Sequence, residues 1–168
     1  MNRDNEPMGR LWAPWRMQYI DGIADSEGCF FCEAATCDEP GVENLVVWKN
    51  ERALCIMNRF PYNNGHLLVA PLDHEGELED LAPEVNEALL AGIVKTKRVL
   101  EKVMNPDGFN IGLNIGRAAG AGVEDHLHFH IVPRWNGDTN FMPVLAGTKV
   151  IPQSLADLYE KLRSALDE

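Results

Sequence analysis

Apolar residues recur along the chain with two different periods, and the longer period predicts two helices. Between Pro83 and Met104 they recur every three or four positions, which places them on one face of a helix. Proline suits the first turn of that helix, where its missing N–H is not needed. A second pattern of this kind runs from Ser154 to Leu166, and we expect Ser154 to be its N-cap. The apolar stripe of the longer helix consists of Val85, Leu89, Ile93, Leu100 and Met104.

Shorter apolar runs predict strands. Two β-rich runs between residues 44 and 57 flank an Asn-Glu pair and predict a hairpin. Residues 65–71 form a buried run that proline ends, and residues 109–116 and 126–134 alternate between apolar and polar positions. Few strands, hairpin connections and separate helices predict an α+β fold: an antiparallel sheet of about five strands with a long helix and a C-terminal helix. A doubly wound parallel sheet would require more βα units.

The length of 168 residues suits one domain with its own core, and we assign residues 29–168 to it. Residues 1–28 are expected to form an N-terminal extension, in which Trp12, Pro14 and Trp15 pack against the domain or a partner subunit. The N-terminus is polar and broken by prolines, unlike a signal peptide, and no apolar run is long enough to span a membrane. We therefore expect a cytoplasmic protein.

The net charge of −11 argues against nucleic acids and membrane surfaces as partners. It also sets a condition on the site. Because the overall field repels a polyphosphate, a pocket for such a substrate must supply hydrogen-bond donors and cations locally.

Three of the five histidines lie within five residues, at the start of the last predicted strand. Strand alternation sends His126, His128 and His130 to one face of the sheet and the apolar residues between them to the other. Structural histidines are the weaker interpretation of so dense a cluster. A metal site is a real competitor, although alternate residues of one strand are too far apart for all three to bind one ion. One of them serving as a ligand with distant residues is easier.

This cluster is suited to chemistry at phosphorus. A neutral imidazole is a competent nucleophile, and its covalent adduct divides one difficult displacement into two easier ones. A neighbouring imidazole can donate a hydrogen bond to a phosphate oxygen. The glycine-rich turn at residues 116–122 permits close approach of backbone N–H groups to phosphate, although it fits neither the P-loop nor the dinucleotide fingerprint.

The run His-Leu-His-Phe-His-Ile-Val from His126 to Val132 resembles the motif of the histidine triad family. The similarity extends back through the segment Gly-His-Leu-Leu-Val-Ala-Pro-Leu-Asp-His, so that it covers about residues 28–135. Leu-Trp-Ala-Pro-Trp-Arg near the start and Pro-Arg-Trp-Asn-Gly-Asp-Thr-Asn-Phe-Met-Pro-Val after the motif resemble the bacterial diadenosine tetraphosphate phosphorylase branch of that family.

The resemblance implies roles for individual residues. His128 would be the nucleophile at the α-phosphorus, forming a nucleotidyl-histidine, and His130 would hydrogen-bond the α-phosphate or the bridging oxygen. His66 matches a further active-site histidine. The implied nucleotide contacts are Asn58 at the ribose hydroxyls, Asn114 and Gly122 near the phosphates, and Phe31 and Leu45 in the nucleobase pocket.

One departure from the family pattern bears on the reaction. Many family hydrolases carry Gln-Ser where this chain has Gly122 and Val123. Glycine removes a donor side chain and opens space, which favours inorganic phosphate over water as second acceptor. We expect diadenosine tetraphosphate and phosphate to yield ATP and ADP. Alternatives are a hydrolase, a nucleoside phosphoramidase and, less favoured, a non-catalytic nucleotide-binding module. Family members commonly dimerise, so we also expect a homodimer.

Cys29 and Cys32 form a CxxC pair, a spacing compatible with zinc, a redox dithiol or a disulfide. A redox pair usually opens a helix in a thioredoxin-like βαβ unit, which the pattern lacks, and disulfides are rare in cytoplasmic proteins. Histidine triad proteins and their uridylyltransferase relatives often supply two further ligands, at positions matching His74 and His126. The resemblance thus implies a structural, tetrahedral zinc site of Cys29, Cys32, His74 and His126, which stabilises the fold rather than activating water.

Overall fold

The computed structural model describes residues 28–140, 142–143 and 150–167. The predicted N-terminal extension with Trp12, Pro14 and Trp15 therefore lies outside the described residues, apart from Gly28. Within the described ranges, no helix combines the length and the apolar character that crossing a bilayer requires.

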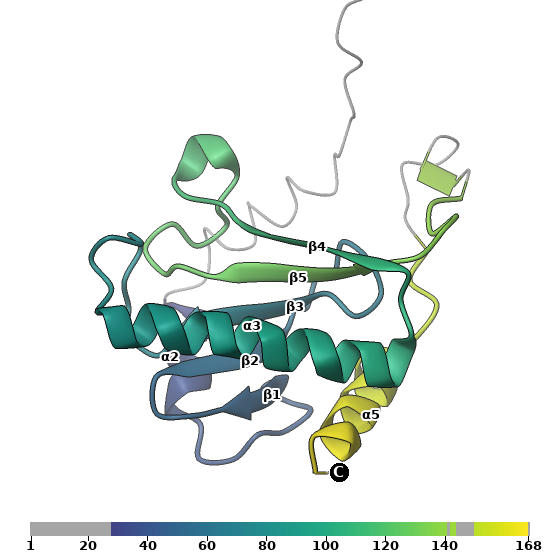
Figure 1. The fold of residues 1–168 in the computed structure, drawn as a ribbon, viewed down its shortest axis with the longest axis horizontal. Coiled ribbons are helices and arrows are strands. Elements are labelled where there is room, and N and C mark those ends of the chain that lie inside the picture. Colours follow the sequence, from purple (N-terminus) through teal and green to yellow (C-terminus); the bar gives the residue numbers. More distant parts are fainter. Residues whose placement is uncertain (1–27, 141, 144–149, 168) are drawn as a thin grey trace, which may run out of the picture.

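Five strands form one antiparallel sheet in the order β1-β2-β3-β5-β4 (Figure 1). This confirms the predicted sheet. The catalytically interesting strand β5 lies between β3 and β4, so residues from both neighbours can meet its side chains. The strands are β1 Val46–Lys49, β2 Ala53–Met57, β3 Leu67–Pro71, β4 Gly108–Leu113 and β5 Phe129–Arg134.

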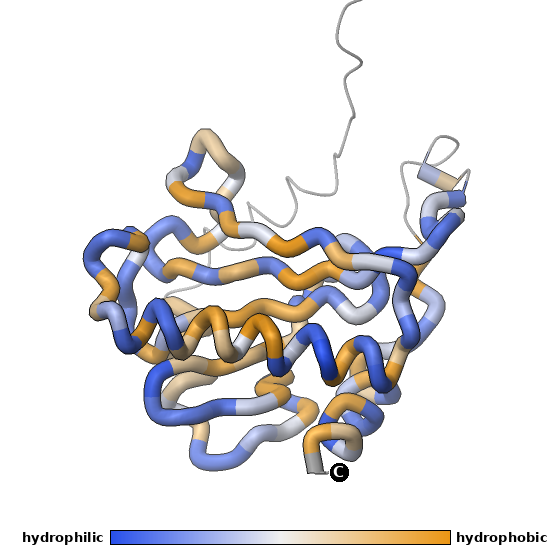
Figure 2. The backbone as a smooth tube through the Cα atoms, in the orientation of Figure 1, coloured by the Kyte–Doolittle hydropathy of each residue, from blue (hydrophilic) through white to orange (hydrophobic). Residues whose placement is uncertain are grey.

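The two faces of the sheet are covered differently. Helices α3 (Pro83–Met104) and α5 (Leu155–Asp167) pack on one face, where most of the core lies. The short helix α2 (Phe30–Thr36) packs on part of the other face through a smaller apolar cluster. In Figure 2 the central strands are mostly hydrophobic, whereas α3 alternates between hydrophobic and hydrophilic positions.

Helix α3 has the predicted bounds, with Pro83 in its first turn. The predicted stripe faces the core: Val85, Leu89, Ile93 and Leu100 are buried, and Met104 packs against them. For α5 the N-cap prediction is confirmed, because the Asp157 N–H donates to the Ser154 Oγ at 3.1 Å.

The helix lies close to the sheet because of one glycine. A Cβ at Gly92 would come within 2.6 Å of the Trp48 ring, which lies beneath the helix. The indole Nε1–H of Trp48 donates to the buried Thr96 Oγ1 at 3.0 Å. Gly92 and Thr96 therefore form the part of the α3 surface against which the Trp48 side chain of β1 packs.

Three sequence-based expectations need correction. Strand β5 begins at Phe129 rather than His126, so His126 and His128 lie in the segment before it. The pattern gave no helix at the CxxC pair, yet α2 begins directly after Cys29, so the pair does open a helix. The βαβ context of a redox dithiol is still missing. Strand β4 ends at Leu113 rather than Gly116, because the chain turns there and Gly116 has a φ of 73°.

Candidate active site and metal site

The three histidines of the triad face the side of the sheet opposite to α3 and α5. The intervening Leu127, Phe129 and Ile131 belong to the core on the helix side, as the alternation predicts. The rings of His128 and His130 are 5.0 Å apart between centroids. A row of imidazoles thus lies on this face, with His130 in β5 and the buried His126 and His128 in the segment that leads into it.

Local hydrogen bonding fixes the tautomer of His128. Its Nδ1 lies 2.8 Å from the backbone oxygen of His126, which can only accept, so Nδ1 carries the proton. The lone pair of the neutral ring is then on Nε2. Burial is the main cause of a lowered His128 pKa, and the bond to the His126 carbonyl acts in the opposite direction. His128 is therefore a neutral base at physiological pH.

A relay of hydrogen bonds also fixes His130. The backbone N–H of Tyr62 donates to His66 Nδ1 at 3.1 Å, so the proton of the neutral His66 ring is on Nε2. That Nε2 lies 2.9 Å from His130 Nδ1, which must accept. The neutral His130 ring consequently carries its proton on Nε2, as a donor. The ring next to His128, 5.0 Å away between centroids, can thus act as a donor.

Burial keeps His66 in this neutral state. It lowers the pKa of His66 to about 3, and the neighbouring His130 and His128 act in the same direction. Asn58, itself buried, completes the setting: its Nδ2 lies 3.2 Å from His66 Nδ1, and its Oδ1 accepts the Phe60 N–H at 2.8 Å. Asn58 therefore contacts the predicted active-site histidine directly.

The Tyr62 ring is a neighbour of the site that the sequence did not single out. It stacks on His130 at 5.6 Å between centroids with an interplanar angle of 18°, and it lies 4.5 Å from the His66 ring. In the sequence, only its position four residues before His66 connects Tyr62 with the site. An isolated tyrosine in a loop forms no pattern from which such a contact can be predicted.

A second network braces the β2–β3 loop that carries Tyr62. The Asp138 carboxylate accepts two hydrogen bonds from Arg134 and one from Asn63 Nδ2 at 2.8 Å. The Arg134 guanidinium, hydrogen-bonded to Asp138, holds the pKa of that carboxyl far below its usual range. Arg134 is therefore committed to an ion pair. Asp138 joins the segment after β5 to the loop before His66.

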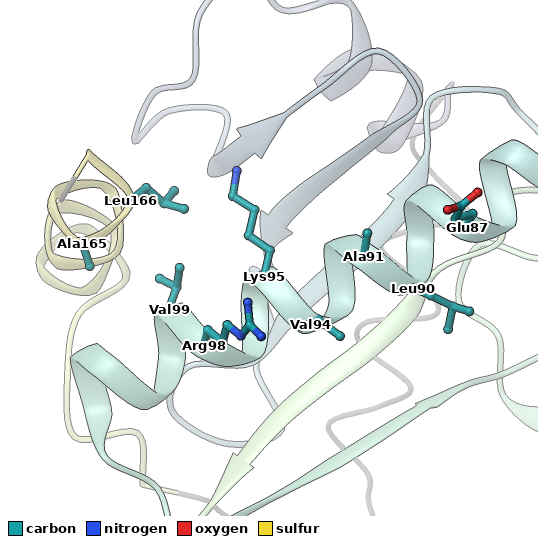
Figure 3. A pocket seen from close by; sticks show the side chains of 9 residues that line it. All are labelled: Glu87, Leu90, Ala91, Val94, Lys95, Arg98, Val99, Ala165 and Leu166. Atoms are coloured by element: carbon teal, nitrogen blue, oxygen red, sulfur yellow. The ribbon is translucent and has the colours of Figure 1, made fainter.

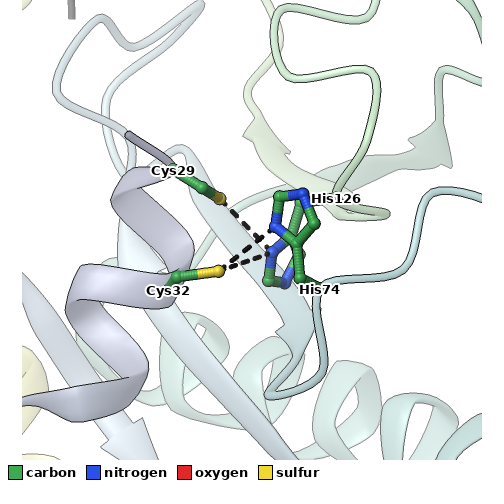
Figure 4. A group of neighbouring side chains, drawn as sticks. All are labelled: Cys29, Cys32, His74 and His126. Carbon is green, nitrogen blue, oxygen red and sulfur yellow. Dashed lines mark hydrogen bonds between the residues drawn. The ribbon is translucent and has the colours of Figure 1, made fainter. Parts of the chain in front are cut away.

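Cys29, Cys32, His74 and His126 meet at the end of the row of histidines (Figure 4). Cys32 Sγ lies 3.2 Å from His74 Nδ1, and the sulfurs of Cys29 and Cys32 lie 3.3 and 3.7 Å from His126 Nδ1. Tetrahedral zinc separates sulfur and nitrogen ligands by about 3.6 Å, which follows from its usual bond lengths. The four ligand atoms all lie within 4.8 Å of one another, so the cluster could hold a metal ion.

The surroundings prepare these ligands. His126 Nε2 donates to the Pro71 carbonyl at 3.0 Å, so its Nδ1 lone pair faces the two sulfurs, the second-shell arrangement usual for metal-bound histidine. The His74 loop is held against the triad because the Leu127 N–H donates to the Glu75 carbonyl at 2.7 Å. Lys49 donates to the carbonyls at the end of α2 and ties that helix to β1.

The remaining predicted contacts lie in different environments, and one of them, Leu45, belongs to the core cluster on the side of α3 and α5. Asn114 follows β4, and its Nδ2 lies 3.5 Å from the Gly120 carbonyl in the glycine turn, while Gly122 is half-buried. Phe31 has no exposed surface, and its ring centroid lies 4.9 Å from those of His126 and of His128, so it packs against the triad from α2. Leu45 is buried with a φ of 59°. Nucleotide contacts of these four residues stay predictions.

The HIT domain family matches residues 39–137, the segment that carries the triad, His66 and His74. The chain belongs to the histidine triad family. Among curated relatives, the AP-4-A phosphorylase of Mycobacterium tuberculosis is 40% identical over 160 residues, covering 90% of this chain and 81% of that protein. A bis(5'-nucleosyl)-tetraphosphatase of Schizosaccharomyces pombe is 34% identical over 97 residues, covering 58% of this chain and 53% of that protein.

Solved structures agree with this membership. A zinc-bound histidine triad family protein from Mycobacterium smegmatis superposes with a TM-score of 0.66 at 30% identity, covering 83% of this chain and 94% of that one. The predicted α+β fold with its antiparallel sheet is thus confirmed as that of the histidine triad family.

Proposed function

We propose that this histidine triad enzyme is a nucleotidyltransferase that cleaves diadenosine tetraphosphate with inorganic phosphate, releasing ATP and ADP. The observation that carries the proposal is the pair of fixed tautomers on two neighbouring rings: His128 has its lone pair on Nε2, and His130, 5.0 Å away between centroids, has its N–H on Nε2. The similarity to the AP-4-A phosphorylase over 90% of the chain supports the choice of substrate.

In the first step, the lone pair of His128 Nε2 forms a bond to the α-phosphorus while the bond to the bridging oxygen breaks. ATP leaves with that electron pair and AMP stays on the histidine. The adduct ring is cationic, and the His126 carbonyl that accepts from Nδ1 stabilises its charge. His130 donates to the phosphate oxygens as negative charge builds there.

In the second step, an oxygen of inorganic phosphate attacks the same phosphorus, the P–N electron pair returns to Nε2, and ADP leaves. We propose that Gly122 provides the space for this acceptor, because Val123 beside it packs into the apolar cluster next to α2 and offers no donor. We further propose that Asn114 binds the phosphates, that Asn58 binds the ribose, and that Phe31 and Leu45 border the nucleobase.

The cluster of Cys29, Cys32, His74 and His126 is proposed to hold structural zinc. Its two thiols, two imidazoles and near-tetrahedral spacing fit that ion, and its four protein ligands leave no position for a substrate. Bound zinc would supply a cross-link between α2, the loop after β3 and the segment that leads into β5. Zinc ligation by thiols, together with four free cysteines, suits a reducing compartment and hence the cytoplasm.

The proposed homodimer pairs the exposed face of α3 with that of a second copy. Leu90 and Val94 are 62% and 47% exposed and lie one turn apart. They border a groove of about 650 Å³ between α3 and the end of α5 (Figure 3). If the α3 helices of two copies pair antiparallel and cross at the level of Gly92 along the helix axis, Glu87 of each copy lies opposite Arg98 of the other. This gives the charge complementarity of an isologous interface.

Product analysis tests the reaction. Diadenosine tetraphosphate is incubated with the protein, with and without phosphate, and the nucleotides are identified by mass spectrometry. We expect ATP and ADP in equal amounts, with ADP formation requiring phosphate. AMP formation independent of phosphate would instead establish the hydrolase alternative, to which the tetraphosphatase relative points. Tight nucleotide binding with neither turnover nor a nucleotide-labelled protein would indicate a non-catalytic binding module.

A further inference from the structure

Gly112 lies in the middle of β4, directly opposite His130 on β5. Cross-strand partners share a face of the sheet, and the adjacent Leu113 packs against the core on the helix side. Position 112 therefore belongs to the face of the sheet on which the imidazoles lie. It is the cross-strand neighbour of the proposed phosphate donor, and it has no side chain.

The fold gives no reason for glycine there. The φ of Gly112 is outside the left-handed region, and a Cβ added to it would meet no atom of the described residues within 4 Å. Glycine weakens the interior of a strand, because it orders a flexible backbone and contributes no packing. Close approach of a ligand is one of the physical reasons for a glycine inside a strand, and at Gly112 the position opposite His130 favours it.

The neighbours of His130 show where a ligand can extend. On the β3 side, His66 Nε2 lies 2.9 Å from His130 Nδ1 and the Tyr62 ring stacks on the imidazole. Along β5, the His128 ring is 5.0 Å away on one side and the buried Val132 follows on the other. Of the neighbouring positions around the His130 ring, the one on β4 has no side chain, because it is Gly112.

We infer that Gly112 determines specificity for a bulky leaving group: it leaves the floor beside His130 open for the polyphosphate chain of the departing nucleotide. This inference rests on the proposed function. The chain of a dinucleoside polyphosphate crosses β4 at position 112, two residues before Asn114, the proposed phosphate contact that follows the strand. The AMP half lies on the other side of the reacting phosphorus and does not depend on position 112.

The chain contains a matched control. Gly108 lies on the same strand and the same face, opposite Arg134, and a Cβ there also meets no atom of the described residues within 4 Å. Gly108 and Gly112 differ in their distance along β4 from His130. Valine suits a strand at either position, so the two variants differ in what the added side chain can block.

The test uses binding as well as turnover. In a His128→Asn background, which cannot form the adduct, dissociation constants are measured by calorimetry for AMP and for diadenosine tetraphosphate. We expect Gly112→Val to weaken binding of the dinucleotide by about tenfold or more, which is the usual size of a steric penalty, while AMP binding changes by less than about twofold. With the nucleophile intact, kcat/KM for the dinucleotide falls in parallel. Gly108→Val leaves all these values unchanged.

Three results would overturn the inference: equal weakening of AMP and dinucleotide, no weakening of either, or the same loss in the Gly108→Val protein. A changed oligomeric state of Gly112→Val in light scattering would also overturn it, because position 112 would then face a second copy of the chain. Failure of the proposed function is recognised separately, since the unsubstituted protein would then not cleave diadenosine tetraphosphate.

Discussion

The Nδ1 of His128 donates to the backbone oxygen of His126 at 2.8 Å, and the side chain of His126 is one of the four potential metal ligands. One residue thus contributes its carbonyl to the proposed nucleophile and its ring to the metal cluster. The position of His126 is fixed further by its bond to the Pro71 carbonyl. The metal cluster and the site of chemistry are therefore joined through two consecutive peptide units.

This connection predicts different consequences for two substitutions. Cys29→Ser removes a proposed zinc ligand and should lower the melting temperature, because the cross-link to α2 is lost. His128→Ala should melt close to the unsubstituted protein yet form no nucleotidyl adduct, since it removes the nucleophile and leaves the cluster intact. Scanning calorimetry and mass spectrometry of the protein after incubation with substrate measure the two effects. Equal melting temperatures for both variants would contradict this division of roles.

Removal of the metal is expected to reduce stability reversibly. Zinc bound by two thiols and two imidazoles stabilises the folded state by its binding free energy, and this is lost when a strong chelator is added. Melting curves recorded with chelator, and again after zinc is restored, test the prediction. Cys29→Ser serves as the control, because its melting temperature should respond much less. A chelator effect of the same size in that variant would place the metal elsewhere.

His66 makes stability depend on pH. Its pKa is about 3 in the fold and near 6.5 when unfolded, so the unfolded chain binds a proton that the fold excludes. Above pH 6.5 His66 is neutral in both states and the fold keeps its full stability. As the pH drops from 6.5 toward 3, the unfolded chain takes up the proton, and the free energy of unfolding falls by about 1.4 kcal/mol per pH unit.

Urea unfolding at several pH values measures this contribution. Relative to His66→Gln, the unsubstituted protein should lose its stability advantage steadily between pH 6.5 and pH 4, because only the unsubstituted protein has the group that the fold holds neutral. A difference between the two proteins that does not change with pH would show that His66 is not held neutral.

The contact between Gly92 and Trp48 predicts a stability effect far from the chemistry. A methyl group at Gly92 would lie 2.6 Å from the indole, so α3 must move away from the sheet or Trp48 must leave its bond to Thr96. We expect Gly92→Ala to destabilise the fold by about 1–3 kcal/mol despite the better helix propensity of alanine. Leu90→Ala on the exposed face of the same helix is the control and should change stability by less than about 1 kcal/mol in the monomer. Denaturant unfolding compares the two.

The proposed dimer can be tested on α3. Glutamate in place of both Leu90 and Val94 puts charge into the exposed apolar groove and should yield a monomer, without unfolding the chain, because neither side chain belongs to the core. Sedimentation velocity measures the state of association. A double variant that sediments like the unsubstituted protein would show that this face is not the interface.

The sequence by itself determined the elements and the chemistry that depend on local pattern. The period of the apolar residues located α3 to the residue, because a 22-residue helix carries enough turns for its stripe to be unmistakable. Strand alternation alone placed the three triad histidines on one face. Their motif, carried by contiguous residues, was sufficient to indicate the family.

Only the tertiary structure decided relationships between residues far apart in the chain. Helix α2 was missed, because seven residues give too short a pattern and the helix is stabilised by packing against the sheet. The tautomer of His130 depends on His66, 64 residues away, and on a backbone N–H of the same loop. The open floor at Gly112 depends on strand register, which hydrogen bonds between β4 and β5 set. The hydrophobic pattern of the sequence specifies on which face of an element a side chain lies, whereas the pairing of strands and helices in the fold specifies which residues it contacts there.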